Sequence, residues 1–127
     1  MSTTPNYASA PRYGAAAIAS AETSRTAPTQ VGTVPTAGAS GSRLDLVRVN
    51  ATATTTQGTV RLFVHDGTNY RLIRELLVYP VTPSATQPAF AIDLTFEGGL
   101  VLPAGHSLRA TTEKAESFHV SAWGGDF

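Results

Sequence analysis

The sequence predicts an all-β protein, an antiparallel β-sandwich or jelly roll that carries an extended N-terminal arm. After residue 42, short runs alternate apolar and polar residues, which is typical of half-buried strands. Turn residues separate these runs about every 8–12 residues, as in sandwich domains. Before residue 43, the chain consists largely of Ala, Thr, Ser, Pro and Gly. We therefore expect an arm over residues 1–42 and a β-sandwich domain over residues 43–127.

Length and composition limit the classes of function. The chain has 127 residues, enough for one domain with a hydrophobic core, and contains no cysteine, which excludes disulfides and thiolate metal sites. Its 9 basic and 9 acidic residues give a net charge of zero, which argues against nucleic acid or an anionic membrane as partner. No apolar run approaches the roughly 20 residues of a membrane span, and a signal-peptide pattern is absent, so we expect no cleaved export signal.

The arm predicted over residues 1–42 contains few large apolar side chains, so it can bury little surface against its own ordering entropy. Two interpretations remain open at this stage. The segment is either a disordered tail or an arm that becomes ordered on a partner, with Tyr7, Tyr13 and Ile18 as anchors. The stretch "QVGTVPTAG" is also compatible with an edge strand, where Pro35 is tolerated.

The strands of the domain follow from alternation. The clearest run is "FAIDLTFE", which directs two phenylalanines, an isoleucine and a leucine inward and Ala, Asp, Thr and Glu outward. A polar turn, "EKAE", is expected to join the last two strands as a hairpin. The predicted strands are 47–54, 59–64, 69–80, 90–97, 107–112 and 117–123.

The segment 69–80 is ambiguous, because its apolar residues recur at a spacing compatible with a helix or a strand. Three signals favour a strand. Asp66 and Gly67 form a good tight-turn dipeptide, the run before them is rich in β-branched residues, and Pro80 ends the segment.

The neighbouring residues His65 and Asp66 are the most suggestive ionisable pair, but adjacent strand residues point to opposite faces, so the pair is poorly placed for a catalytic dyad. The corner of a hairpin explains them better. The three histidines, His65, His106 and His119, lie on separate segments without a metal-binding spacing. We predict that the protein is not an enzyme, with no catalytic residues, no metal site and no cofactor.

Aromatic residues are more informative. Tyr70, Tyr79 and Trp123 lie at strand ends or opposite the apolar face, where such side chains stack on a sugar or anchor a protein interface. For Trp123 we favour a third interpretation, in which a second sheet or the N-terminal segment covers the ring, because lone aromatic residues are usually packed.

Four stretches, "VRLFVHDGTNYRLIREL", "LVLPAGHSLRATT", "ESFHV" and the terminal "GGDF", resemble small structural proteins of tailed bacteriophages, namely virion proteins of the capsid decoration, or cement, type. The resemblance covers roughly residues 43–127, with a looser likeness over residues 1–42. These motifs are structural, so the resemblance transfers no active-site residues.

The resemblance implies a protein that binds the phage head and stabilises the shell by bridging capsid subunits. Its partners would be the major capsid protein or other virion subunits, in addition to copies of itself, with a trimer favoured. Its location would be the capsid surface, after synthesis in the host cytoplasm. The alternative is a receptor- or glycan-binding module of a phage tail or fibre. The candidate partner-binding residues are Tyr7, Tyr13, Ile18, Tyr70 and Trp123.

Overall fold

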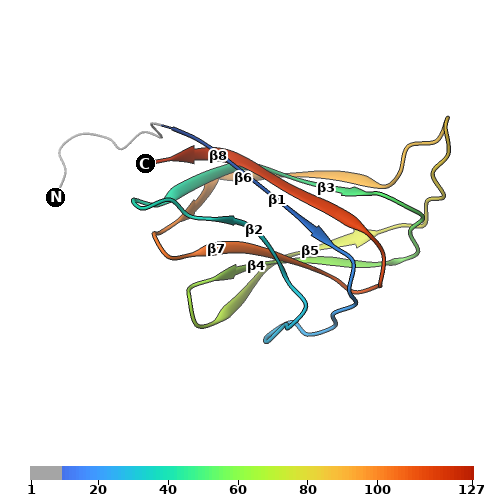
Figure 1. Cartoon of the computed structure of the whole chain (residues 1–127), viewed down its shortest axis with the longest axis horizontal. Helices are drawn as coiled ribbons and strands as arrows, with labels where there is room; N and C mark the ends of the chain where they lie inside the picture. The colour runs from blue at the N-terminus through green and yellow to red at the C-terminus, as the bar shows by residue number, and fades with distance from the viewer. Residues whose placement is uncertain (1–9) are drawn as a thin grey trace.

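A computed structural model describes residues 10–127 and shows an all-β protein without helices in that range. Two four-stranded antiparallel sheets pack face to face, so the predicted antiparallel β-sandwich is confirmed (Figure 1). The strands are β1 (Ala10–Ile18), β2 (Gly32–Thr36), β3 (Ser42–Ala51), β4 (Gly58–His65), β5 (Tyr70–Val78), β6 (Ala91–Leu102), β7 (Ser107–Thr112) and β8 (Phe118–Asp126).

The chain passes back and forth between the two sheets. Sheet A has the strand order β1-β8-β3-β6, and sheet B has the order β2-β7-β4-β5. Among these strands, only β4 and β5 are consecutive in sequence and also paired. The hairpin predicted at "EKAE" is therefore wrong, because this turn carries the chain from β7 in sheet B to β8 in sheet A. Alternation identifies strands, but the choice of partner depends on contacts that are distant in sequence.

The composition break at residue 42 is not a structural boundary. Strand β1 pairs with β8 along its whole length, from Ala10 opposite Asp126 to Ile18 opposite Phe118. Strand β2 pairs with β7, which confirms the edge strand anticipated in "QVGTVPTAG". The prediction of an arm over residues 1–42 is thus wrong for residues 10–42, which belong to the sandwich. Residues 1–9, with Tyr7, lie outside the described residues.

Small residues allow β1 and β2 to close one side of the sandwich. A Cβ atom on Gly14 would lie 2.2 Å from the Val34 carbonyl oxygen, and one on Gly32 would lie 2.7 Å from Cγ2 of Ile18. Neither distance is compatible with a side chain, so the two edge strands touch only because both positions are glycine. Glycine at positions 14 and 32 is therefore a packing requirement.

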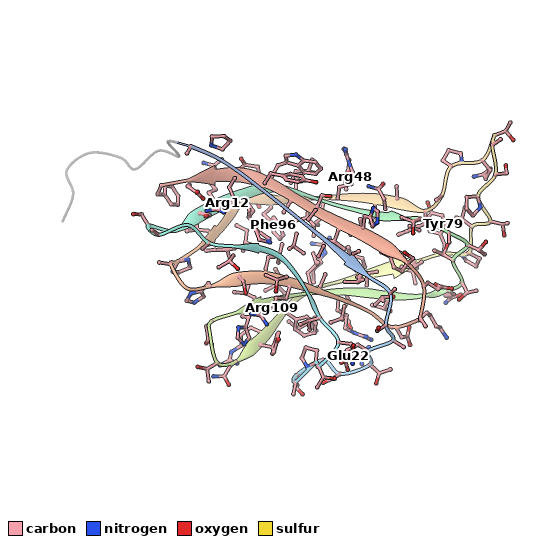
Figure 2. The ribbon with its side chains drawn as sticks, viewed as in Figure 1. Arg12, Glu22, Arg48, Tyr79, Phe96 and Arg109 are labelled. Carbon is pink, nitrogen blue, oxygen red and sulfur yellow. The ribbon has the colours of Figure 1, made fainter. Side chains whose placement is uncertain are left out.

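Hydrogen bonds to one carboxylate fasten the start of β1 to the end of β8. Arg12 donates two hydrogen bonds to Asp126, each of 2.8 Å, and the Ser42 hydroxyl donates a third of 2.6 Å. These bonds lower the pKa of Asp126, and the bond from Arg12 has the largest effect. Figure 2 labels Arg12 near the end of the molecule where the C-terminus lies.

The core lies between the sheets, and the alternation predicted from sequence fills it. The outward residues predicted in β6, such as Asp93 and Thr95, are exposed. Ile18 is 6% exposed and belongs to the core, so its predicted role as a partner anchor is wrong. It follows the period of two in β1, which turns it inward beside Ala16. Fully buried core side chains include Leu44, Val47, Val49, Val60, Leu62, Phe90, Leu102, Leu108, Phe118 and Val120.

The ambiguous segment is strand β5, as predicted, and the tight turn before it joins β4 to β5. Gly67 adopts a positive φ of 98°, which glycine tolerates best. Oδ1 of Asp66 accepts hydrogen bonds from the N–H groups of Thr68 at 2.9 Å and Asn69 at 2.7 Å, and these bonds lower the pKa of Asp66. His65 and Asp66 therefore form the corner of a hairpin.

Because of the contact between β1 and β2, we expect substitutions at two neighbouring positions to change the free energy of unfolding by very different amounts. Gly14→Val should lower the free energy of unfolding by about 2 kcal/mol or more, because the new side chain collides with the backbone of β2. Ala15→Val is the control. Its side chain is exposed, and we expect a change within about 0.5 kcal/mol. Thermal and urea unfolding of both variants measure the difference, and equal stability would contradict the close contact.

Candidate functional site

The outer face of sheet A carries a pair of exposed aromatic rings. Tyr13 of β1 lies directly opposite Trp123 of β8, and the ring centroids are 5.4 Å apart at an interplanar angle of 54°. Tyr13 is 59% exposed and Trp123 is 36% exposed. The N-terminal segment thus covers Trp123 in part, as expected, but leaves both rings accessible to a ligand. Such an exposed pair is a common feature of binding surfaces.

Arg48 of β3 extends the aromatic pair. Its guanidinium carbon lies 5.5 Å from the Trp123 ring centroid, within the range of a cation–π interaction. The same guanidinium donates two hydrogen bonds to Asp93 of β6, at 2.6 and 2.9 Å. These bonds raise the pKa of Arg48 and lower that of Asp93, so both groups stay charged and neutralise each other. Figure 2 shows Arg48 projecting from the upper layer, which is sheet A.

A shallow hollow of about 230 Å³ lies beside Tyr13 on this face. Its floor is low because Ala15 and Ala17 of β1 stand opposite Ser121 and His119 of β8. The alanines add little height, whereas Tyr13 and His119 rise at the two ends. We call Tyr13, Arg48, Asp93, His119, Ser121 and Trp123 the sheet A patch. The hollow is lined by Tyr13, Ala15, Ala16, Ala17, His119 and Ser121.

A second exposed surface lies at the end of β5, an edge strand of sheet B. Leu77 is 64% exposed and Tyr79 is 54% exposed, and we call these two residues the β5 surface. The Tyr79 ring lies 4.9 Å from the buried Phe90 ring in an edge-on arrangement, and its carbonyl accepts a 3.0 Å hydrogen bond from the Thr55 hydroxyl. The exposed tyrosine is therefore held in place by contacts within the domain. Figure 2 shows Tyr79 at the end of the molecule away from Arg12.

Tyr70 lies on the outer face of sheet B, away from Tyr13 and Trp123. Its ring is half-buried and contacts the rings of Phe63, at 5.8 Å, and His65, at 4.4 Å. Arg109 of β7 donates a 2.8 Å hydrogen bond to the Tyr70 hydroxyl, and its guanidinium carbon lies 5.5 Å from the ring centroid. Tyr70 is thus engaged on its ring face and at its hydroxyl group, and its main role is to cover Phe63, which is fully buried.

The segment between β1 and β2 is ordered around Glu22. Its carboxylate accepts hydrogen bonds from the N–H groups of Ser24 at 3.1 Å, Thr29 at 2.7 Å and Gln30 at 2.9 Å. These backbone bonds lower the pKa of Glu22 to about 2, and the bond from Gln30 has the largest effect. The Glu22 carbonyl also accepts a hydrogen bond from the buried Arg61 of β4, so this segment lies against sheet B. Figure 2 shows Glu22 on the side of the molecule opposite Arg48.

The histidines that could serve in catalysis or metal binding either have structural roles or lie on different sheets. His65 rests on Tyr70, and its Nδ1 accepts a 3.2 Å hydrogen bond from the Gly67 N–H. His65 and His119 belong to strands of different sheets. Within residues 10–127, no group of three or more His, Asp or Glu side chains is arranged to hold a metal ion.

The structure thus brings together two of the predicted partner-binding residues, Tyr13 and Trp123. It separates Tyr70 from them and buries Ile18 in the core. Sequence reasoning missed the contribution of Arg48, Asp93, His119 and Ser121. Alternation already directs Arg48 and Asp93 outward, but it does not reveal that β3 and β6 are neighbours, and that pairing is what joins the two side chains.

Comparison with known proteins finds no matching family model and no significant match among curated proteins or solved structures. In the described part of the chain, no helix is long and apolar enough to cross a membrane.

The lowered pKa of the Glu22 carboxylate predicts that the segment between β1 and β2 loses stability in acid. Its pKa falls from an ordinary 4.5 to about 2 on folding, so the charged carboxylate stabilises the fold fully above about pH 4.5. This stabilisation is lost progressively as the pH falls towards 2. We expect hydrogen-exchange protection of the Thr29 and Gln30 amides to fall over that range. In Glu22→Gln, protection should be lower at pH 6 and nearly independent of pH. Unchanged protection in that variant would contradict the role assigned to the carboxylate.

Proposed function

We propose that this protein is a non-enzymatic structural component of a tailed-bacteriophage virion, a decoration protein that binds the capsid surface and stabilises the shell. The sequence resemblance in "VRLFVHDGTNYRLIREL" and "LVLPAGHSLRATT" supports the proposal. The first stretch spans most of β4 and β5 with their hairpin, and the second runs from the end of β6 through β7. The motifs thus correspond to the framework of the sandwich, as structural motifs should.

The strand order also supports the proposal. Eight strands whose connections pass between two sheets, except from β4 to β5, fit the double Greek key of a jelly roll, a fold common in viral capsid proteins. The jelly-roll topology expected from sequence is therefore part of the proposal. Such a sandwich offers a rigid body that resists deformation when it bridges neighbouring subunits.

The observation that carries the proposal is the β5 surface. Leu77 and Tyr79 are exposed apolar residues beside an edge strand, and β5 pairs with β4 alone among the described strands. An edge of this kind offers backbone donors and acceptors to another chain, and fixed apolar side chains add contact area at little entropic cost. We propose that a subunit of the shell occupies this surface, and the major capsid protein is the favoured candidate.

In this mechanism, each copy bridges shell subunits, and many copies act together against internal pressure. Burial of one leucine side chain contributes roughly 1.5–3 kcal/mol before ordering costs. Assembly of copies into a trimer would multiply this modest affinity, because the second and third contacts become intramolecular. The trimer belongs to the proposal, as does location on the capsid surface after synthesis in the host cytoplasm.

A second candidate function is a receptor- or glycan-binding module of a phage tail or fibre. The sheet A patch favours it, since exposed aromatic rings beside a hollow with polar walls suit a small polar ligand. The two functions differ in copy number and place. A decoration protein occurs in many copies on the head, and a fibre module in few copies on the tail, so labelling the protein in purified virions separates them.

The β5 surface predicts which substitutions weaken attachment. Leu77→Asp should lower the affinity for undecorated heads of the encoding phage by about tenfold or more, because it places a charge in the contact. Val101→Asp is the matched control, since Val101 is 55% exposed on β6 of the other sheet. Sedimentation of heads with bound protein measures the occupancy. Equal loss in both variants, or in neither, would contradict attachment through the β5 surface.

A further inference from the structure

We propose that the hollow on the outer face of sheet A binds one ring of a neutral saccharide. The site goes beyond the proposed attachment to the shell, which uses the β5 surface of sheet B. If the protein is instead a fibre module, the saccharide is the ligand of that second candidate function, and the inference then rests on it. Four observations carry the inference: an aromatic wall, polar groups opposite it, a matching size and a neutral charge.

The aromatic wall is the Tyr13 ring, supported from behind by Trp123. Tyr13 is 59% exposed, and its centroid lies 5.4 Å from that of Trp123, which limits its movement. One face of a pyranose ring presents C–H groups, whose hydrogens carry partial positive charge. Such a face is attracted to the negative face of an aromatic ring, while the sugar hydroxyls remain free for other bonds. Small alanine side chains at positions 15 and 17 let the sugar approach the sheet beside the tyrosine.

Polar groups line the other side of the hollow. The His119 ring and the Ser121 hydroxyl both reach it, and neither makes a hydrogen bond with another side chain among the described residues. The hydroxyl is both donor and acceptor, and a neutral imidazole has one nitrogen of each kind. These two side chains thus match the mixed donor and acceptor character of adjacent sugar hydroxyls.

Size and charge narrow the ligand class. A hollow of about 230 Å³ is smaller than the roughly 300–1,000 Å³ of sites that enclose drug-sized ligands, so it fits one sugar ring with its neighbours outside. The only basic group in the patch besides His119 is Arg48, and Asp93 neutralises it through two hydrogen bonds. A sugar with a carboxylate would find beside the hollow only an arginine that is already paired with Asp93. Neutral hexoses and N-acetylhexosamines fit best.

The test uses the full chain labelled with ¹⁵N and three neutral probes: cellotetraose, chitotetraose and β-1,4-galactotetraose. We expect at least one to shift the amide signals of Ala15, Ala17, His119 and Ser121, with a Kd of about 0.1–1 mM. Tyr13→Ala should weaken binding about tenfold by removing the wall. Ala15→Leu should weaken it as much by filling the hollow, although both aromatic rings remain. Val101→Ala is the control, because Val101 is similarly exposed at 55% but lies outside the patch, and this variant should bind the probe as tightly as the unchanged protein does.

Each outcome decides the proposal. Absence of shifts with all three probes at about 10 mM overturns it, and so does binding that Ala15→Leu leaves intact. If sialyllactose binds at least as tightly as the neutral probes, the neutral class is wrong. If no probe binds and Tyr13→Ala instead reduces occupancy on phage heads, the patch is a protein interface. A different result would show that the proposed attachment to the shell is wrong. In that case Leu77→Asp binds heads as well as the unchanged protein does, while a saccharide still binds.

Discussion

The closure of the sandwich depends on how closely β1 and β2 approach each other. The two strands belong to different sheets, and they meet where Gly14 lies against the backbone of Val34. A side chain at Gly14 or Gly32 would push the two strands apart, so glycine is needed at these two points of closest approach. Ile18 and Val34 are the large apolar residues that this part of the chain contributes to the core, and both are buried.

That constraint explains why amino-acid composition predicts the wrong structure for residues 10–42. Composition rules treat a lack of large apolar residues as an inability to fold, because such a segment buries little surface. Here the segment gains its order from backbone pairing with β8 and β7, which the rules do not count. Alternation, by contrast, is a local property of each strand, so the run from Phe90 to Glu97 correctly predicts the buried face of β6.

The proposed binding surfaces also depend on information that is partly local and partly distant in sequence. Sequence indicated that Tyr13 and Trp123 were candidates one by one, but their contact exists because β1 and β8 pair with Tyr13 directly opposite Trp123. A shift of that register by one residue would turn one ring towards the core. The hollow has the same origin, since alanines become its floor only when Ser121 and His119 stand beside them. The tight turn at Asp66 and Gly67 was predictable, because its chemistry lies within a few residues.

The position of β8 between β1 and β3 has a consequence for synthesis. The first described strand pairs only with the last one, so β1 has no strand partner until residues 118–126 have left the ribosome. With about 100 residues between the two strands and elongation at about 5–20 residues per second, the delay is on the order of ten seconds. An unpaired strand rich in valine or isoleucine would invite aggregation during that time. Alanine and glycine have low β-propensity, which disfavours pairing of the waiting strand with another chain, and one of them, Gly14, later permits the close contact with β2.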